Sequence, residues 1–218
     1  MFEMSETLTQ HSEARNKAVI FDFDGTIADS FEVFVETIAE VLHRKPLTPE
    51  ELDYLRGSSL AEIQHYFQIK PWQKPGILLR GRHEVANKMD RVHMFEGMDE
   101  VLRSISEKDH TIFILSSNSK DSIQTFLDKY HLDPYVSGIY GGISVTGKAG
   151  HLRQLLTQEN LRAEDAIYVG DEVRDIEATQ KVGMQCISVA WGYSTLNSLR
   201  EHTPSAIVST PTELIDRF

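Results

Sequence analysis

Two carboxylates follow a short hydrophobic run near the start of the chain. The run is 18–21, the carboxylates are Asp22 and Asp24, and Gly25 comes next. A short apolar run predicts a buried strand, and the glycine permits a tight turn directly after it. Two acids at a strand end can bind a hard cation through oxygen. One of them can also attack phosphorus, because an Asp carboxylate is able to form an aspartyl-phosphate.

Three more groups of polar residues stand after other hydrophobic runs or open helices. They are Ser117 with Asn118, the lone Lys148, and the acids Asp171, Glu172 and Asp175. Each group alone has a structural explanation: a helix cap, a surface lysine, or acids on an exposed helix face near its positive end. Ligands of open α/β sheets bind beyond the carboxyl ends of the strands, so we expect these residues to meet at one edge.

Phosphoryl transfer suits this set of side chains. The reaction depends on positioning and on stabilising charge at the equatorial oxygens of phosphorus. A carboxylate nucleophile beside a phosphate dianion meets like-charge repulsion, which Mg²⁺ and the ammonium of Lys148 would offset. The hydroxyl of Ser117 can hold one phosphate oxygen, and backbone N–H groups after Asp22 can hold others.

The elements that must position these residues alternate between strand and helix. Strands are predicted at 18–21, 111–115, 135–139, 166–169, 185–190 and 206–208. Helices are predicted at 97–107, 119–130, 147–158, 173–182 and 211–218. Such alternation predicts βαβ units and therefore a parallel sheet, so the core is expected to be a doubly wound α/β domain.

A helical insert is predicted directly after the first strand. Four helical segments occupy 30–44, 48–57, 58–67 and 76–90, whereas a simple crossover needs one. We therefore predict an N-terminal extension at 1–15, a core at 16–28 and 94–218, and a helical cap domain at 29–93. Between residues 43 and 95 there are nine Lys or Arg against six acids. A positive lid over an acidic site would attract an anionic substrate, although an ordinary solvated face has the same composition.

Composition narrows the classes of function. The 218 residues carry a net charge of −11, which argues against a nucleic-acid partner. The one cysteine, Cys186, lies in an apolar run and suits a core thiol in a reducing, cytoplasmic setting. No apolar run approaches the roughly 20 residues of a membrane span, so no membrane partner is expected.

The motifs together resemble those of the haloacid dehalogenase superfamily. F-D-F-D-G-T at 21–26 is similar to its first motif, and Ser117 in L-S-S-N-S fits the second better than Ser116 does. Lys148 fits the third by position, and V-G-D-E-V-R-D-I-E-A at 169–178 fits the fourth. With W-G-Y at 191–193, the chain most resembles the phosphoglycolate phosphatase-like group, which has a helical cap after the first motif.

This resemblance implies a mechanism and a metal. Asp22 would be the nucleophile, and Asp24 would be the general acid and then the general base. Mg²⁺ would be bound by the Asp22 carboxylate, the backbone carbonyl of Asp24, and Asp171. Glu172 or Asp175 would orient metal waters or Lys148, and Ser117, Asn118 and Lys148 would hold the phosphate. Haloacid dehalogenases of the superfamily lack the second acid, so Asp24 favours the hydrolysis of phosphate esters.

The expected substrate is a small phosphorylated metabolite. In the related families the turn between the second and third insert helices reaches toward the nucleophile, so Arg56 at this turn would contact an anionic leaving group such as that of phosphoglycolate. The structural alternative for Arg56 is a surface ion pair with Asp53.

Three other functions stay open: a sugar-phosphate mutase resembling β-phosphoglucomutase, a pyrophosphatase or nucleotidase, and a non-catalytic binding protein. The mutase is disfavoured because Ser58 and Ser59, not an arginine, follow Gly57. The binding protein is disfavoured because every motif position is filled. The oligomeric state and the role of residues 1–15 cannot be read from the sequence.

Overall fold

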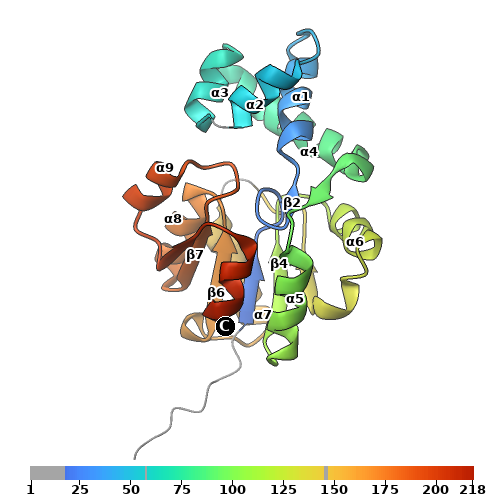
Figure 1. The fold of residues 1–218 in the computed structure, drawn as a ribbon. Helices are drawn as coiled ribbons and strands as arrows, with labels where there is room; N and C mark the ends of the chain where they lie inside the picture. Colours follow the sequence, from blue (N-terminus) through green and yellow to red (C-terminus); the bar gives the residue numbers. More distant parts are fainter. Residues whose placement is uncertain (1–17, 57, 145–146) are drawn as a thin grey trace, which may run out of the picture.

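The chain folds around a six-stranded parallel sheet. The computed structural model describes residues 18–56, 58–144 and 147–218, so the predicted extension at 1–15 and Gly57 lie outside the described residues. Figure 1 shows the sheet below a group of helices. Its strands are β1 (Ala18–Phe21), β4 (Thr111–Leu115), β5 (Gly138–Tyr140), β6 (Ala166–Gly170), β7 (Gln185–Val189) and β8 (Ala206–Val208). The predicted α/β fold class is confirmed.

Strand β1 occupies the centre of the sheet. The order is β5-β4-β1-β6-β7-β8, so the chain winds outward in opposite directions on the two sides of β1. Phe21, the last residue of β1, is in register with Ile114 of β4 and Val169 of β6. The winding direction reverses at the carboxyl ends of these three strands, which is where open α/β sheets bind their ligands.

Helices cover both faces of the sheet. One face packs against α5 (Met98–Glu107), α6 (Lys120–Lys129) and the C-terminal 3-10 helix (Pro211–Arg217). The other packs against α7 (Lys148–Gln158), α8 (Val173–Val182) and Leu199 of α9 (Leu196–Glu201). Residues of β1 alternate between the two hydrophobic clusters: Val19 and Phe21 face one, Ala18 and Ile20 the other. All four are buried, as the continuous apolar run predicted.

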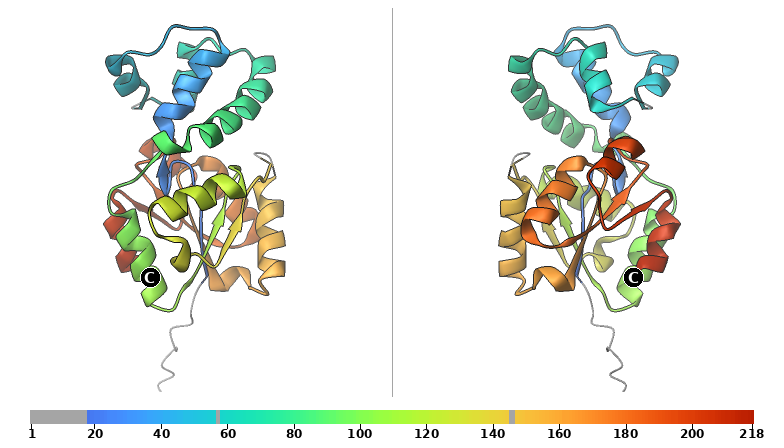
Figure 2. Two further views of the ribbon diagram at one scale, coloured as in Figure 1. Left: turned by 90° about the vertical axis from the view of Figure 1, so that its right-hand side faces the viewer. Right: turned by 90° about the vertical axis from the view of Figure 1, so that its left-hand side faces the viewer.

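The predicted helical insert lies over the carboxyl edge of the sheet (Figures 1 and 2). It contains α1 (Phe31–Val41), α2 (Pro49–Arg56), α3 (Leu60–Tyr66) and α4 (Lys74–Asn87). These helices have a hydrophobic cluster of their own, which includes Phe31, Val35 and Leu55. Two chain crossings join the insert to the core, at β2 (Ala28–Asp29) and β3 (His93–Met94). The domain boundaries themselves stay a prediction.

Several predicted elements differ from the structure. The strand expected at 135–139 begins three residues later, because Asp133–Tyr135 form a 3-10 turn. The segment after Pro211 is a 3-10 helix, not an α-helix. The antiparallel pair β2–β3 was not predicted, since two-residue strands leave no hydrophobic period to detect. Cys186 is buried in β7, as predicted.

Candidate active site

Asp22 stands at the carboxyl end of β1 and extends the sheet by one residue. Its N–H donates to the carbonyl of Val169 at 2.8 Å, which fixes the backbone against β6. The residue is only 3% exposed. Oδ1 accepts from the N–H of Phe23 at 2.8 Å, and Oδ2 accepts from Nζ of Lys148 at 2.6 Å. The carboxylate is therefore oriented by two hydrogen bonds and shielded from water.

Lys148 is the first residue of α7 and lies buried between two acids. Its Nζ donates to Asp22 and also to Oδ1 of Asp175. Burial alone would lower the pKa of Lys148, but the charges of Asp175 and Asp22 outweigh it and raise the pKa above its ordinary value. The ammonium is thus held permanently charged beside the Asp22 carboxylate.

Asp171 follows β6 and is enclosed by backbone. Tyr193 donates its N–H to Oδ2 at 2.7 Å, and the Thr26 hydroxyl donates to Oδ1 at 3.0 Å. A Cβ on Gly25 or Gly192 would overlap the Asp171 side chain, so both turns need glycine for this close approach. Burial, and then the charge of nearby acids, raises the pKa of Asp171 well above its usual range.

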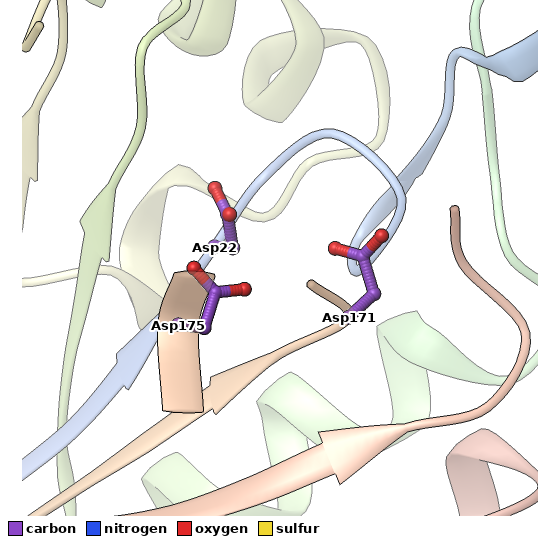
Figure 3. A group of neighbouring side chains, drawn as sticks. All are labelled: Asp22, Asp171 and Asp175. Carbon is purple, nitrogen blue, oxygen red and sulfur yellow. The ribbon is translucent and has the colours of Figure 1, made fainter. Parts of the chain in front are cut away.

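Three acids offer a place for a cation (Figure 3). Asp22, Asp171 and Asp175 each have a carboxylate oxygen within 4.8 Å of the other two. All three are buried, and Lys148 neutralises only part of their charge. Hard oxygen donors with excess negative charge in a dry site fit a divalent ion such as Mg²⁺. The structural alternative, in which Asp171 and Asp175 share an exposed helix face, is excluded because both are 0% exposed.

Asp24 is positioned by residues from two other segments. Its Oδ1 accepts from the hydroxyl of Ser30 at 2.7 Å, and Asn118 Nδ2 lies 3.4 Å from Oδ2. Burial raises the pKa of Asp24 to about 6, although the Ser30 hydrogen bond opposes the shift. A carboxyl group with such a pKa can both give and take a proton near neutral pH. The carboxylate of Asp24 is not part of the three-acid cluster.

The two serines after β4 differ in their surroundings. Ser116 is 1% exposed, and its Oγ accepts from the N–H of Asn118 at 3.0 Å. Ser117 is half-buried, and Ser119 is the residue that caps α6 through its side chain. The side chain of Asn118 is buried, and its Oδ1 accepts from the N–H of Ser119 at 2.8 Å.

Glu172 and Arg174 add a second charged pair beside the cluster. Arg174 donates from Nη2 to the carboxylate of Glu172. The backbone N–H of Glu172 donates to Oδ2 of Asp175 at 3.0 Å. Sequence reasoning assigned no role to Arg174. Its position could have indicated a role, because Arg174 lies inside V-G-D-E-V-R-D and is the second residue of α8.

Arg56 lies apart from the buried cluster. As the last residue of α2 it donates from Nη1 to both carboxylate oxygens of Asp29, at 2.9 and 3.0 Å, and is 45% exposed. The ion pair is therefore with Asp29, not with Asp53. Its guanidinium also lies 5.2 Å from the centre of the Phe31 ring. A cavity of about 370 Å³ beside this pair is lined by Arg91 and His93 among others.

A doubly wound sheet with a buried cluster of acids and a lysine at its switch point is the arrangement of an α/β enzyme of hydrolase type. Comparison with known proteins agrees, since the model of the haloacid dehalogenase-like hydrolase family matches residues 19–189. The chain therefore belongs to the haloacid dehalogenase-like hydrolases. None of the helices in the described part of the chain combines the length and hydrophobicity needed to span a bilayer.

Similar proteins extend over nearly the whole chain. A phosphoglycolate phosphatase of Synechococcus elongatus is 31% identical over 202 residues, which cover 91% of this chain and 95% of that protein. A 5'-nucleotidase of Pseudomonas aeruginosa is 25% identical, with coverages of 86% and 88%. A haloacid dehalogenase-like hydrolase of Streptococcus pneumoniae has the same fold, with a TM-score of 0.73, 22% identity, and coverages of 93% and 98%.

Proposed function

We propose that the protein is a Mg²⁺-dependent phosphatase that hydrolyses a small phosphate ester through an aspartyl-phosphate on Asp22. One observation carries the proposal: the buried Asp22 carboxylate accepts a hydrogen bond from Lys148 and has an oxygen within 4.8 Å of oxygens of two further buried carboxylates. This arrangement offers a nucleophile together with the positive charge that a phosphate dianion requires. The curated relatives named as phosphatases support it.

The first half-reaction transfers the phosphoryl group to the enzyme. A carboxylate oxygen of Asp22 attacks phosphorus while the bond from phosphorus to the ester oxygen breaks. Asp24 gives its proton to the departing oxygen, so the product leaves as an alcohol. Lys148 holds Asp22 in place and lowers the repulsion between its carboxylate and the incoming phosphate. Asn118 and Ser117 follow β4, and Asn118 Nδ2 lies 3.4 Å from Oδ2 of Asp24. We propose that both residues bind phosphate oxygens.

The second half-reaction returns the enzyme to its starting state. Asp24, now ionised, takes a proton from water, and the water oxygen attacks phosphorus. The bond between phosphorus and Asp22 breaks, which releases inorganic phosphate and restores the carboxylate. The raised pKa of Asp24, about 6, supports both roles because the group can exchange its proton near neutral pH.

The acids of the site would hold the metal. We propose the carboxylates of Asp22 and Asp171 and the backbone carbonyl of Asp24 as ligands. Asp175 accepts a hydrogen bond from Lys148, and Glu172 accepts one from Arg174, so we do not propose these two acids as direct ligands. When bound, Mg²⁺ would neutralise the developing charge on the phosphoryl oxygens.

Removal of the metal gives a direct test. We expect a chelator to abolish turnover of phosphate esters and added Mg²⁺ to restore it. Ca²⁺ should inhibit, because its larger and looser coordination shell misplaces the oxygen ligands. The rate of phosphate release is the measurement, with Asp171→Asn as a variant that should need much more Mg²⁺ to reach half-maximal rate. Full activity after exhaustive chelation would contradict the metal requirement.

The substrate is proposed to be a small anionic ester such as phosphoglycolate. The relative of that name at 31% identity supports this choice, whereas others are named 5'-nucleotidase and pyrophosphatase. A turnover screen decides among them. It should compare kcat/KM for phosphoglycolate, nucleoside monophosphates, pyrophosphate and a hexose phosphate. A highest value for phosphoglycolate is expected, and a highest value for another member of the panel would reassign the substrate.

Arg56 is the residue proposed to read the second anionic group of the substrate. Its bonds to Asp29 both use Nη1, so the guanidinium keeps other N–H groups for a carboxylate. We expect Arg56→Ala to raise KM for phosphoglycolate about tenfold, the cost of one hydrogen bond between charged groups, and to change KM for p-nitrophenyl phosphate little. Arg91→Ala is the matched control, because Arg91 lines the same cavity and pairs with Glu36. Equal changes for both esters would remove Arg56 from the proposed site.

A further inference from the structure

The hydroxyl of Ser30 does not have the role that its position predicts. Ser30 precedes α1, where a serine usually caps the helix by accepting from a backbone N–H. In this structure its side chain makes no capping bond. It donates instead to Oδ1 of Asp24 at 2.7 Å, and it lies 2.7 Å from the hydroxyl of Tyr193. Ser30 itself is fully buried, whereas Asp24 and Tyr193 are each partly exposed.

The direction of this hydrogen-bond chain follows from counting hydrogens. A serine hydroxyl has one hydrogen, and Ser30 gives it to Asp24. The Tyr193 hydroxyl, which lies 2.7 Å from Ser30 Oγ and has one hydrogen of its own, must then donate to Ser30. The chain therefore runs from Tyr193 through Ser30 to Oδ1 of Asp24. That oxygen is occupied, and Oδ2 is the oxygen turned toward Asn118.

Tyr193 also links three parts of the molecule. Its backbone N–H holds Asp171, and its ring stacks on Phe34 at 5.5 Å and meets Phe31 edge-on at 5.8 Å. Both phenylalanines belong to α1, the first helix of the insert. Tyr193, in the loop between β7 and α9, thus contacts the insert, a proposed metal ligand, and the serine that is bound to Asp24. Its position is fixed by the ring contacts, so its hydroxyl is a rigid anchor for Ser30.

We propose that Tyr193 is a positioning residue for proton transfer by Asp24. Acting through Ser30, it occupies Oδ1 and presents Oδ2 to the oxygen of the leaving group. This inference rests on the proposed phosphatase function. Without the Tyr193 hydroxyl, the Ser30 hydroxyl is free to rotate and the carboxyl of Asp24 is free to turn. Misplaced proton transfer should slow the departure of basic leaving groups most, because weakly basic ones leave without a proton.

Substituted phenyl phosphates measure this effect directly. The esters have nearly the same shape and bind alike, but their phenols differ in acidity. We propose to measure kcat/KM, which covers the steps up to the first loss of phenol, for phenyl and p-nitrophenyl phosphate. Tyr193→Phe keeps the ring contacts and removes the hydroxyl, and Ser30→Ala breaks the chain one residue nearer to Asp24. For each variant the loss should be about tenfold greater for phenyl phosphate than for p-nitrophenyl phosphate.

Controls separate positioning from general damage. Ser30→Thr keeps the hydroxyl and should return the ratio of the two kcat/KM values to that of the wild type. Tyr135→Phe removes a tyrosine hydroxyl that accepts from Arg103 near the opposite end of the strands, and should leave both rates unchanged. Equal losses on both esters in Tyr193→Phe would overturn the inference, as would unchanged rates. If Tyr193→Phe does not fold, the same comparison in Ser30→Ala decides. A wild-type protein that hydrolyses neither of these esters nor any member of the substrate panel overturns the proposed function itself.

Discussion

Asp22→Asn is expected to reduce turnover by about 10⁴-fold or more, the scale on which hydrolases lose activity when their nucleophile is removed. An amide has the shape of the carboxylate but is a poor nucleophile, so no aspartyl-phosphate can form. The fold should survive. Asp22 contributes to the like-charge repulsion that raises the pKa values of Asp24, Asp171 and Asp175, so its neutralisation relieves part of that repulsion.

One cost of the substitution is visible in the hydrogen bonds. The two oxygens of Asp22 accept from two donors, the Phe23 N–H and Lys148 Nζ, whereas an asparagine offers one oxygen. We therefore expect a modest loss of thermal stability, measured as a lower unfolding midpoint. Asp109→Asn is a matched control, because Asp109 is exposed and its positive φ of 61° suits asparagine as well as aspartate.

The covalent intermediate can be sought without reference to rate. Rapid acid quenching of the wild-type enzyme with substrate should leave one phosphoryl group on the peptide that contains Asp22. The Asp22→Asn protein should carry none, although it still binds the substrate. Turnover by Asp22→Asn above one part in about 10² of wild type, under conditions that exclude deamidation, would contradict a nucleophilic Asp22. A phosphoryl group found on another residue would reassign the nucleophile.

The sequence predicted the parts of the site that lie at strand ends. Asp22 and Asp171 follow apolar runs long enough to be recognised as buried strands, and parallel strands bring their carboxyl ends together. Lys148 was expected at the same edge because it begins a predicted helix of the βαβ pattern. The structure brings the three residues to one edge, with Lys148 in contact with Asp22. Local periodicity was sufficient because strand and helix alternate in the core after the helical insert, from α5 onward.

Contacts between distant loops were beyond the reach of the sequence. Ser30 reads as a helix cap, and its bond to Asp24 depends on the path of the turn between them. Tyr193 lies 163 residues from Ser30, so no spacing rule relates the two. The partner of Arg56 was equally hidden. A sequence neighbour, Asp53, was the obvious partner, but the tertiary fold brings α2 against Asp29.

Substitution of Lys148 tests the charge balance of the site. We expect Lys148→Ala to lower kcat about 10²- to 10³-fold, the effect of removing one preorganised electrostatic donor. The expectation follows from position, since Nζ lies 2.6 Å from Oδ2 of Asp22 and the side chain is 7% exposed. Without the ammonium, the Asp22 carboxylate loses an orienting partner and faces the phosphate dianion with less positive charge nearby.

The same substitution should also destabilise the fold. Loss of one partner of a buried ion pair costs about 3–5 kcal/mol, because the remaining charge stays buried. Here two carboxylates, those of Asp22 and Asp175, would lose their common partner. Lys148→Met, which fills most of the same volume, separates this charge effect from the effect of a cavity. Denaturant unfolding of both variants is the measurement, with Lys181→Ala on the exposed surface of α8 as the control.

A double variant separates stability from catalysis. The double variant Lys148→Met with Asp175→Asn removes one positive and one negative buried charge. The single side-chain oxygen of the asparagine is enough to accept from the Glu172 N–H. We expect the double variant to recover most of the lost stability while kcat stays about 10²-fold or more below wild type. Recovery of both would mean that Lys148 acts only through folding. A fall in kcat of less than about threefold in Lys148→Ala would exclude Lys148 as the lysine that stabilises phosphoryl transfer.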